Sequence, residues 1–377
     1  MLEARIQKRL EEFELNGLSR RLMPPTGIDL SSNDYLQFAC HPSLKARMSA
    51  AVMEEGCGST GSRLLRGDRN CFSAIERRFA TFKATAAALY FGSGYAANLA
   101  VLSTFLEDGD VVFSDRLNHA SLLDGMKMGK ARKIIFAHSD LAALQHHVDS
   151  IMTKGQRFLV VESLFSMDGD VAPLKEYAAI CKKAGIALII DEAHAIGLYG
   201  DHGTGLIEAN GIADDVFLSI NPAGKALGLA GAFVAGPAWA IEYLMQRGRT
   251  FVFSTAPPPS IAAALDAALD LVEETPQLRN RLQFLTTFLR ELLAGKGLQV
   301  SQAGTQIIPV LLGENARAVS VASALQAKGF DVRAIRPPTV PEGTARLRIS
   351  VNTGLDESIL ECFAHTLEVA MREVGIP

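Results

Sequence analysis

Short apolar segments alternate with helix-like segments from about residue 85 to residue 235. The apolar segments are rich in β-branched and aromatic residues, and they cover residues 86–91, 111–114, 133–136, 158–161, 187–190 and 216–220. This alternation is typical of a mostly parallel sheet with helices on both faces. Ligands of such sheets bind beyond the carboxyl ends of the strands, so the polar residues that follow each segment are the candidates for chemistry.

The two ends of the chain follow other patterns. Residues 1–18 place apolar side chains at helical spacing among charged ones, which predicts an amphipathic helix and not a signal peptide. Three prolines at 257–259 end the alternating pattern, and the Ala- and Leu-rich region to about residue 297 predicts long helices. The remainder predicts a small α+β domain, with strands at 307–312, 332–335 and 347–351 and helices at 316–328 and from 357.

We therefore predict an N-terminal segment over residues 1–45, a large domain over 46–270 and a small C-terminal domain over 271–377. With 377 residues, of which 48% are hydrophobic and 21% charged, the chain is long enough to bury one large core and a smaller one. The net charge of -4 argues against nucleic acid or an anionic membrane as a partner and favours a small-molecule substrate.

Cysteine and histidine usage narrows the chemistry further. The five cysteines are scattered without a Cys-x-x-Cys pair, which indicates free thiols in a reducing cytosol. The eight histidines form no metal-binding motif, so no metal is expected. Residues 226–241 are apolar, but glycines and a proline interrupt them, so we interpret them as a buried strand and turn instead of a membrane span.

Two charged residues follow predicted strands, where a charge without a partner is costly. Asp191 begins the sequence Asp-Glu-Ala-His and needs a cationic partner. A protonated pyridine nitrogen is one, because the carboxylate keeps the ring of pyridoxal phosphate (PLP) an electron sink. Lys225 lies in a Gly-rich apolar setting, where desolvation favours the neutral amine that forms imines.

Each residue also has a plainer interpretation, a helix cap for Asp191 and a solvated turn for Lys225. The Asp-Glu-Ala-His box of a nucleic-acid motor ATPase is disfavoured because no Gly-x-x-x-x-Gly-Lys-Ser/Thr phosphate loop precedes it.

Three further motifs follow neighbouring predicted strands. The turn Gly92-Ser93-Gly94-Tyr95 precedes a helix-like segment, where backbone amides suit a phosphate. His119 is placed to lie flat on a cofactor ring, and Ser166 to hydrogen-bond to the ring or the substrate. Taken singly, each also fits a tight connection, a capping histidine or a turn serine. Together with Asp191 and Lys225, in chain order at successive strand ends, they predict a PLP site.

The most distinctive stretches of the sequence are residues 31–36, 58–65, 114–119, 165–170, 191–194 and 334–348. In these stretches, and over nearly its whole length, the chain resembles the α-oxoamine synthases, which are fold-type I PLP enzymes. The resemblance implies an α/β transferase fold with a large, doubly wound, mostly parallel sheet domain and a smaller C-terminal α+β domain. It also implies a homodimer with sites at the interface.

The resemblance implies a role for each candidate residue around the cofactor. Lys225 is expected to carry PLP as a Schiff base and to move the proton at the substrate α-carbon. Asp191 is expected to pair with the pyridine nitrogen, and His194 with the phenolic oxygen. The remaining cofactor roles are stacking by His119, assistance near the phenolic oxygen by Ser166, and phosphate binding by the backbone of Gly94 and Tyr95.

The resemblance also implies substrate contacts. Asn33 and Arg348 are similar to the pair that holds the amino acid carboxylate in this family, and the forked guanidinium of Arg348 suits that task better than a lysine. Arg20 or its neighbour Arg21, together with Thr339, matches positions that contact the acyl substrate or the product.

One position departs from the family pattern. Pro222 stands three residues before Lys225, where the family usually has a threonine that donates to the phosphate. Proline has neither a hydroxyl nor an N–H group. We therefore expect Asn221, Ser93 or Thr255, from the same chain or from a partner subunit, to replace that contact.

The stretch 334–348, with Arg336-Pro-Pro-Thr-Val-Pro, favours the branch of the family that joins L-alanine to a pimeloyl thioester in biotin biosynthesis, with loss of CO2 and the thiol carrier. The sequence leaves open whether that carrier is coenzyme A or an acyl carrier protein. The alternatives are a glycine C-acetyltransferase, a 5-aminolevulinate synthase, a serine palmitoyltransferase, or a PLP-binding protein without synthase activity.

Overall fold

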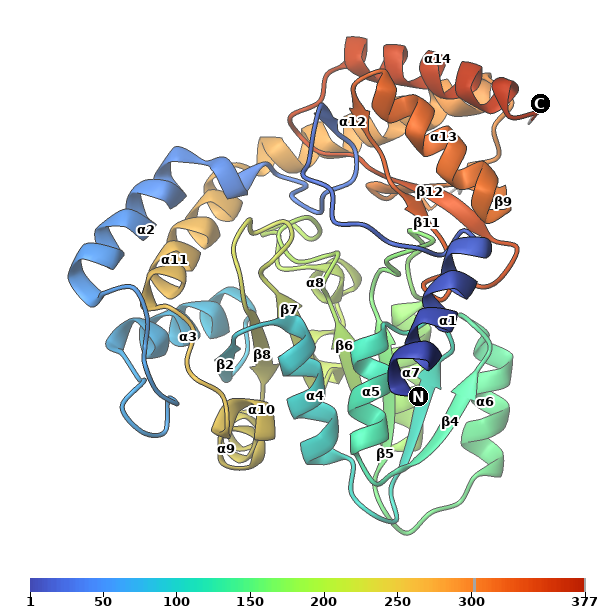
Figure 1. Cartoon of the computed structure of the whole chain (residues 1–377). Helices are drawn as coiled ribbons and strands as arrows, with labels where there is room; N and C mark the ends of the chain where they lie inside the picture. Colours follow the sequence, from blue (N-terminus) through green and yellow to red (C-terminus); the bar gives the residue numbers. More distant parts are fainter. Residues whose placement is uncertain (301–302, 376–377) are drawn as a thin grey trace. The chain divides into compact units, whose positions relative to one another are not determined.

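The structure is a computed structural model that describes residues 1–300 and 303–375. The chain divides into two compact units (Figure 1). The small unit comprises Met1–Tyr35, Met167–Asp170 and Asn280–Pro377, and the large unit comprises Leu36–Ser166 and Val171–Arg279. The three-part domain division at residues 45 and 270 stays a prediction.

A seven-stranded sheet forms the centre of the large unit, with strand order β2-β8-β7-β6-β5-β3-β4. Neighbouring strands from β7 through β6, β5 and β3 to β4 are parallel, whereas β8 runs antiparallel to both β2 and β7. The strands are β2 (Ala87–Phe91), β3 (Val111–Asp115), β4 (Arg132–Phe136), β5 (Arg157–Glu162), β6 (Ile186–Asp191), β7 (Leu218–Pro222) and β8 (Ala232–Gly236).

Every strand predicted between residues 85 and 235 is present, which confirms the α/β class. The last of them, predicted at 216–220, is displaced to Leu218–Pro222, because a 3-10 turn at Ala213–Asp215 precedes it. Pro222 ends that strand and pairs with Ala232 of β8. A strand end tolerates proline, since fewer ladder hydrogen bonds depend on its missing N–H.

Helices cover both faces of the sheet. Successive side chains of a strand point to opposite faces, so an apolar strand needs packing partners on both sides. In β8, Val234 joins the core cluster that includes residues of α4, while the Phe233 ring stacks on Phe79 of α3, with centroids 4.0 Å apart. The helices of this unit are α2 (Pro42–Glu55), α3 (Asn70–Phe82), α4 (Gly94–Phe105), α5 (Ala120–Met128), α6 (Leu141–Ser150), α7 (Leu174–Ala184), α8 (Leu206–Asn210), α9 (Ala238–Arg247), α10 (Arg249–Val252) and α11 (Pro259–Glu274). Helix α12 (Pro276–Gly295) begins in the large unit and continues into the small one.

The small unit is built from both ends of the chain. Strand β1 (Ile28–Asp29) pairs in parallel with β10 (Phe330–Asp331), so the N-terminal segment joins the C-terminal region. An antiparallel sheet has the order β11-β12-β9, and its strands are β11 (Ala334–Ile335), β12 (Ala345–Ser350) and β9 (Ile307–Gly313). The unit's other helices are α1 (Leu2–Leu15), α13 (Asn315–Ala327) and α14 (Glu357–Glu373).

Two details of the small unit differ from the sequence prediction or sharpen it. Of the strand predicted at 332–335, only β11 forms, and Arg333 pairs with Asp331 at the corner between β10 and β11, with Nε to Oδ1 at 2.6 Å. The predicted N-terminal helix forms, but α1 buries none of its residues within the single chain. No helix among the described residues is long and apolar enough to cross a membrane.

Candidate active site

The carboxyl ends of four parallel strands meet at one edge of the large unit's sheet. They carry Asp115 on β3, Glu162 on β5, Asp191 on β6 and Pro222 on β7. Glu162 and Asp191 are direct partners in the β5–β6 register, so two carboxylic acids lie side by side at this edge. Both side chains are buried, which makes their hydrogen-bond partners decisive for their charge.

Asp191 is held by two donors. Its Oδ2 accepts a hydrogen bond of 2.8 Å from Asn98 Nδ2, and its Oδ1 accepts one of 2.9 Å from the backbone N–H of Ala193. Both bonds stabilise the charged carboxylate at a site that is only 4% exposed. The same Asn98 amide also donates to Ser121 Oγ at 2.8 Å, so α4 and α5 both contribute to the orientation of this acid.

Lys225 lies beside His194. The Nζ atom is 2.8 Å from His194 Nε2, and His194 is buried in the turn that follows β6. The loop that carries the lysine is closed by the bond from Gly228 N to Lys225 O at 2.8 Å. Gly228 has a φ of +67° and lies against the backbone of Phe38, so a side chain at this position would disturb the loop. The structure thus brings together Lys225 and His194, two residues for which the sequence predicts separate cofactor roles.

His119 caps the start of α5 and contacts Ser121 and Glu162. Its Nδ1 lies 2.7 Å from Ser121 Oγ, and its backbone N–H donates to Glu162 Oε1 at 2.5 Å. Burial lowers the pKa of His119 below its ordinary value, because desolvation outweighs the attraction of Asp191, and the positive charge of Lys225 lowers it further. A neutral imidazole results at pH 7, which suits a ring that stacks on a cofactor.

The turn Ser93-Gly94-Tyr95 begins α4. Ser93 caps the helix by accepting from Ala96 N at 3.1 Å, and the Tyr95 hydroxyl donates to Asp124. A Cβ atom on Gly94 would lie 2.7 Å from Pro222 Cγ, so only glycine fits between the helix start and the end of β7. The three residues are at most half-buried, and their backbone amides lie where a helix N-terminus attracts anions.

Thr255 is exposed and belongs to a segment that the loop at residues 58–67 holds in place. Ser59 Oγ donates to Pro257 O at 2.6 Å, Ser62 Oγ donates to Val252 O at 3.0 Å, and Ala256 N donates to Gly61 O at 2.8 Å. A Cβ on Gly92 would lie 3.7 Å from Pro257 Cγ, which places this segment beside the Gly92–Tyr95 turn.

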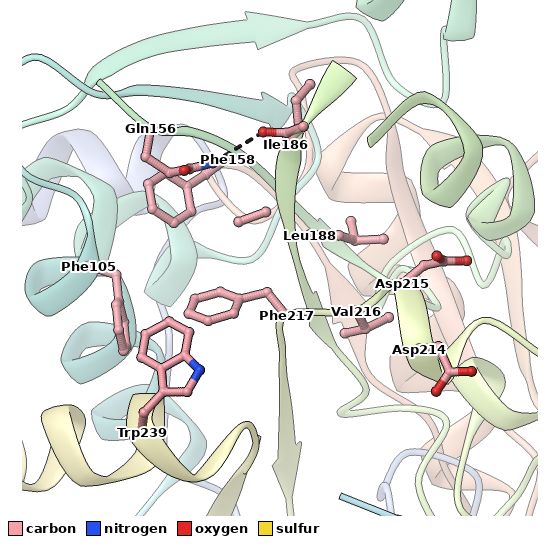
Figure 2. A pocket seen from close by; sticks show the side chains of 12 residues that line it. Phe105, Gln156, Phe158, Ile186, Leu188, Asp214, Asp215, Val216, Phe217 and Trp239 are labelled. Atoms are coloured by element: carbon pink, nitrogen blue, oxygen red, sulfur yellow. Dashed lines mark hydrogen bonds between the residues drawn. The ribbon is translucent and has the colours of Figure 1, made fainter. Parts of the chain in front are cut away.

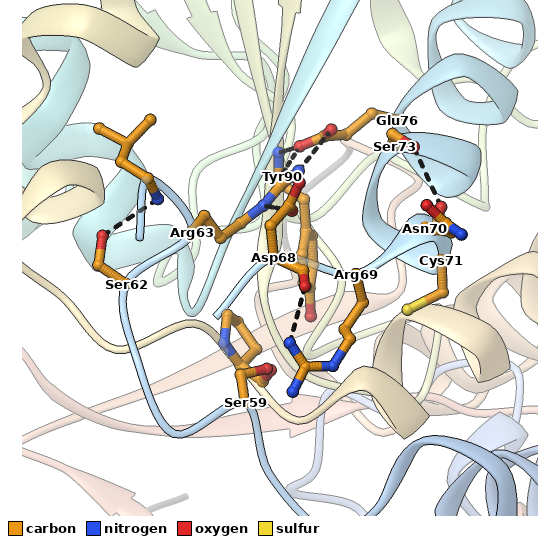
Figure 3. Close-up of polar contacts among 12 residues, drawn as sticks. Ser59, Ser62, Arg63, Asp68, Arg69, Asn70, Cys71, Ser73, Glu76 and Tyr90 are labelled. Atoms are coloured by element: carbon orange, nitrogen blue, oxygen red, sulfur yellow. Dashed lines mark hydrogen bonds and ion pairs between the residues drawn. The ribbon is translucent and has the colours of Figure 1, made fainter. Parts of the chain in front are cut away.

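Arg63 organises that loop (Figure 3). Its guanidinium forms a two-pronged ion pair with Glu76 of α3, with Nη2 to Oε2 at 3.1 Å, and its Nε lies 2.7 Å from Asp68. The opposite oxygen of Glu76 accepts from the backbone N–H of Tyr90 in β2 at 2.8 Å. The contacts with Glu76 anchor the distinctive stretch 58–65 to α3 and, through Tyr90, to the sheet.

Asn221 and Ser166, two further candidates for the site, lie in different environments. Asn221 is fully buried and donates to Ser219 Oγ at 3.0 Å and to Phe233 O at 3.5 Å, so its amide points into the sheet. Ser166 is half-buried in the loop that follows β5, and an isolated bridge between Leu164 and Val171 closes that loop. Its role near a phenolic oxygen stays a prediction.

The small unit carries the predicted carboxylate-binding pair. Arg348 Nη2 donates to Asn33 Oδ1 at 3.0 Å and to the hydroxyl of Tyr35 at 3.2 Å, and its Nη1 donates to Ser350 Oγ at 2.7 Å. Arg348 is 7% exposed. A forked guanidinium beside the Asn33 amide is suited to bind a substrate carboxylate through two hydrogen bonds.

The remaining predicted substrate residues lie elsewhere in the small unit. Arg20 donates to Pro337 O at 3.4 Å, and the exposed Thr339 donates its backbone N–H to Arg336 O at 3.1 Å. Arg336 in turn donates to the carbonyls of Gly17 and Ser19. The segments around Arg20 and Thr339 are therefore joined, while Arg21 is exposed. Their contact with an acyl substrate stays a prediction.

The large unit also has a pocket of about 440 Å³ with an aromatic lining of Phe105, Phe158, Phe217 and Trp239 (Figure 2). It lies where β5, β6 and β7 begin, since its wall includes Gln156, Ile186 and Val216. That is the amino-terminal edge of the sheet, opposite the edge at which α/β sheets bind ligands. None of the predicted site residues lines it.

The arrangement at the carboxyl edge fits PLP. Asp191 provides a hydrogen-bonded carboxylate for a pyridinium, the start of α4 provides backbone amides for a phosphate, and Lys225 provides an amine next to a histidine. Asn98 Oδ1 is buried without a partner among the described atoms, so the polar lining is not saturated by the protein alone. Among the described residues, no group of three or more His, Cys, Asp or Glu side chains could hold a metal ion.

Sequence reasoning missed three residues of this site, namely Asn98, Ser121 and Glu162. Asn98 left a usable signal, because it is a buried polar residue in the Ala- and Leu-rich helix α4, one turn after the Gly-Ser-Gly motif. Glu162 was visible as an acid that ends a predicted buried strand, as Asp191 does. Ser121 was not distinguishable from an ordinary first-turn serine.

A family model described as aminotransferase class I and II matches residues 25–367. The chain belongs to this family. Among curated relatives, an 8-amino-7-oxononanoate synthase from Geobacter sulfurreducens is 43% identical over 92% of this chain and 89% of its own. Another protein of that name, from Anaeromyxobacter dehalogenans, is 42% identical over 97% of this chain and 95% of its own.

Solved structures agree with the fold of this family. A serine palmitoyltransferase from S. paucimobilis, solved with a bound PLP–myriocin adduct, has a TM-score of 0.92 at 27% identity and covers 98% of this chain and 97% of its own. An 8-amino-7-oxononanoate synthase from Francisella tularensis has a TM-score of 0.81 at 30% identity, with coverages of 93% and 99%. The fold-type I PLP transferase class predicted from the sequence is confirmed.

Proposed function

We propose that the protein condenses L-alanine with a pimeloyl thioester to give 8-amino-7-oxononanoate, CO2 and the free thiol carrier, as a PLP-dependent acyltransferase of biotin biosynthesis. The observation that carries the proposal is the identity of 42–43% to proteins named 8-amino-7-oxononanoate synthase over more than nine-tenths of the chain. The chemistry of the carboxyl edge supports it, since the groups proposed to hold the cofactor and to move the proton are present there.

The reaction replaces the α-carboxylate of alanine with the pimeloyl group, and bound PLP supplies the electron sink for the negative charge that develops at the α-carbon. Lys225 Nζ takes the proton from that carbon and returns one after CO2 has left. The neighbouring His194 Nε2, at 2.8 Å, orients the amine through their hydrogen bond. Asp191, held by Asn98 and Ala193, keeps a fixed negative charge for the pyridine nitrogen, and His119 covers the ring and excludes water.

The site for the phosphate is the start of α4, where Ser93, Gly94 and Tyr95 direct their backbone amides. Pro222 donates nothing there, and its packing against Gly94 holds the helix start close to the end of β7. Asn221 is a poor replacement because its amide donates inside the sheet. Ser93 and Thr255 are therefore the side chains that we propose for the missing threonine contact.

Arg348 is proposed to bind the alanine carboxylate together with Asn33. Replacing Arg348 with lysine is expected to raise the KM for alanine by about 10- to 100-fold, because a point charge loses the forked, two-bond contact that is worth about 1.5–3 kcal/mol. Steady-state kinetics with varied alanine would measure this. Arg333→Lys is the control. It makes the same arginine-to-lysine change in the small unit, at the ion pair with Asp331, and should leave the KM for alanine unchanged.

The acyl donor and the assembly state belong to the same proposal. Acyl carrier protein and coenzyme A share the phosphopantetheine thiol, so the substrate panel includes both.

We propose a homodimer, and the exposed apolar side chains support it, with Leu10 57%, Phe13 50% and Leu65 84% exposed in the single chain. We also place the protein in the cytoplasm, which its five free cysteines support.

A substrate panel tests the function. The PLP-loaded protein is incubated with L-alanine, glycine or L-serine, each combined with pimeloyl-coenzyme A, a pimeloyl carrier protein, acetyl-, succinyl- or palmitoyl-coenzyme A. Thiol release and product mass are then measured. The proposal expects turnover with alanine and a pimeloyl donor to exceed every other pair. Preferred turnover of serine with palmitoyl-coenzyme A, or of glycine with any donor, would refute it.

A further inference from the structure

Glu162 is a buried acid at the carboxyl edge to which the proposed reaction assigns no role. It ends β5, is 2% exposed, and lies directly opposite Asp191 in the strand register. Its Oε1 accepts the backbone N–H of His119 at 2.5 Å. Its own backbone N–H donates to Asn118 Oδ1 at 3.2 Å, while Asn118 Nδ2 donates back to Val160 O on the same strand at 2.7 Å. The loop from 118 to 119 is therefore fastened to β5 at three points.

A chain of short contacts continues from this carboxyl group to Asp191. It runs from Glu162 to the backbone of His119, from His119 Nδ1 to Ser121 Oγ at 2.7 Å, from Ser121 Oγ to Asn98 Nδ2 at 2.8 Å, and from Asn98 to Asp191 Oδ2 at 2.8 Å. These residues come from β5, α5, α4 and β6. The two acids that are neighbours in the sheet are thus also the two ends of a polar ring around the site.

We infer that Glu162 is a positioning residue of this site, which fixes the His119 ring over the cofactor position. Glu162 also carries its own proton at neutral pH, so that Asp191 remains the one charged carboxylate of the pair. The inference rests on the proposed function only in assigning His119 to the cofactor. Glu162 acts through His119 and is not expected to touch the reacting atoms.

The charges around Glu162 support the protonated state. The pKa of Glu162 is raised to about 8, chiefly by burial and by the negative charges of Asp191 and Asp115, while Lys225 and the His119 hydrogen bond act to lower it. Asp191, by contrast, has two donors that stabilise its charge. Two adjacent buried carboxylates do not both ionise readily, so the one with the poorer set of donors keeps the proton.

The sign of the pH effect follows from this. An acid whose pKa is about 4.3 when unfolded and about 8 when folded holds a proton only in the folded state over that interval, so its contribution to stability falls as pH rises. Between pH 5 and 8, the unfolding equilibrium constant of the wild type should therefore rise relative to that of Glu162→Gln, by up to about tenfold per pH unit.

Two variants separate positioning from proton holding. Glu162→Gln keeps an acceptor for His119 and is neutral at every pH, whereas Glu162→Ala removes the acceptor. At pH 7 we expect Glu162→Gln to change kcat by less than about threefold and Glu162→Ala to lower it by about 100-fold, because a misplaced ring costs a factor of that order. Should Glu162→Ala fail to fold, Glu162→Asp, which withdraws the acceptor by one methylene, takes its place.

Two measurements on the apoprotein test the inference without any substrate. Nuclear magnetic resonance of the histidine rings should show the His119 signals shifted in Glu162→Ala and unchanged in Glu162→Gln at pH 7. Urea unfolding from pH 5 to 8 should show the divergence between wild type and Glu162→Gln. Asp110→Asn is the matched control, because Asp110 is a buried acid that accepts two backbone N–H groups at the other end of β3, and it should alter neither readout beyond a uniform loss of stability.

The outcomes are distinct. His119 signals and kcat that stay at wild-type values in Glu162→Ala, or in Glu162→Asp, would overturn the positioning role. A constant difference in unfolding free energy between wild type and Glu162→Gln across pH 5–8 would overturn the proton-holding role. Inactivity of the wild type in the substrate panel, with both apoprotein effects present, would count against the proposed function and leave the inference intact.

Discussion

Replacing Lys225 with alanine is expected to lower kcat by at least ~10⁴-fold and to remove the visible absorbance of the lysine-bound cofactor. The magnitude follows from the two tasks that we assign to the amine, covalent attachment and proton transfer at the α-carbon, of which proton transfer alone contributes about 10²- to 10⁴-fold. The amine lies 2.8 Å from His194 Nε2, so its removal also breaks that contact.

Absorbance of the purified protein with added PLP and single-turnover kinetics would measure the two effects separately. Lys130→Ala is the control, since Lys130 is an exposed lysine of the same unit and should leave spectrum and kcat unchanged. A Lys225→Ala protein that retains both the absorbance and more than a hundredth of the wild-type kcat would contradict the assignment.

The Lys83–Glu192 pair is expected to be the most sensitive electrostatic element of the fold. Lys83 Nζ lies 2.6 Å from Glu192 Oε2 and 2.6 Å from Thr204 O, and the two side chains are 3% and 0% exposed. Removing one partner leaves the other charge buried alone, so Lys83→Met should lower the free energy of unfolding by about 3–5 kcal/mol. Because Glu192 follows Asp191 directly, PLP affinity should fall as well.

Urea unfolding of the apoprotein would measure the loss. The double variant Lys83→Met/Glu192→Gln should recover most of it, since no buried charge then remains without a partner. Lys182→Met breaks an exposed pair with Asp215 and serves as the control, with no measurable change expected. If the single and double variants were equally destabilised, the cost would lie in packing and not in the charge.

Local patterns in the sequence were sufficient for the elements that surround the site. The strands before Asp191 and Lys225 are short apolar segments between helices, and their order along the chain already indicated that their ends meet at one edge. The helix start at Gly94 was visible from the glycine and serine that precede it. These features depend on neighbours within a few residues, which is why they could be recognised in the sequence.

The surroundings of Pro222 could not be predicted from the residues next to it in the sequence. The sequence revealed that a phosphate donor was missing, but not that the proline ring would pack against Gly94. Asn221 was an equally reasonable substitute until the structure showed its amide bonded to Ser219 and Phe233 inside the sheet. The face to which a strand residue points depends on the register of the whole sheet, and one residue of shift reverses it.

By itself, the sequence determined the α/β class, the parallel strands in chain order, and the lysine, aspartate and histidines that end or follow them, because hydrophobic period and strand-end position are local properties. Only the tertiary structure decided which of these groups share hydrogen bonds. Asn98 reaches Asp191 across 93 residues of chain, and Glu162 reaches His119 across 43. Such pairings arise from the packing of helices on the sheet, where buried polar groups must find partners whatever their distance in sequence.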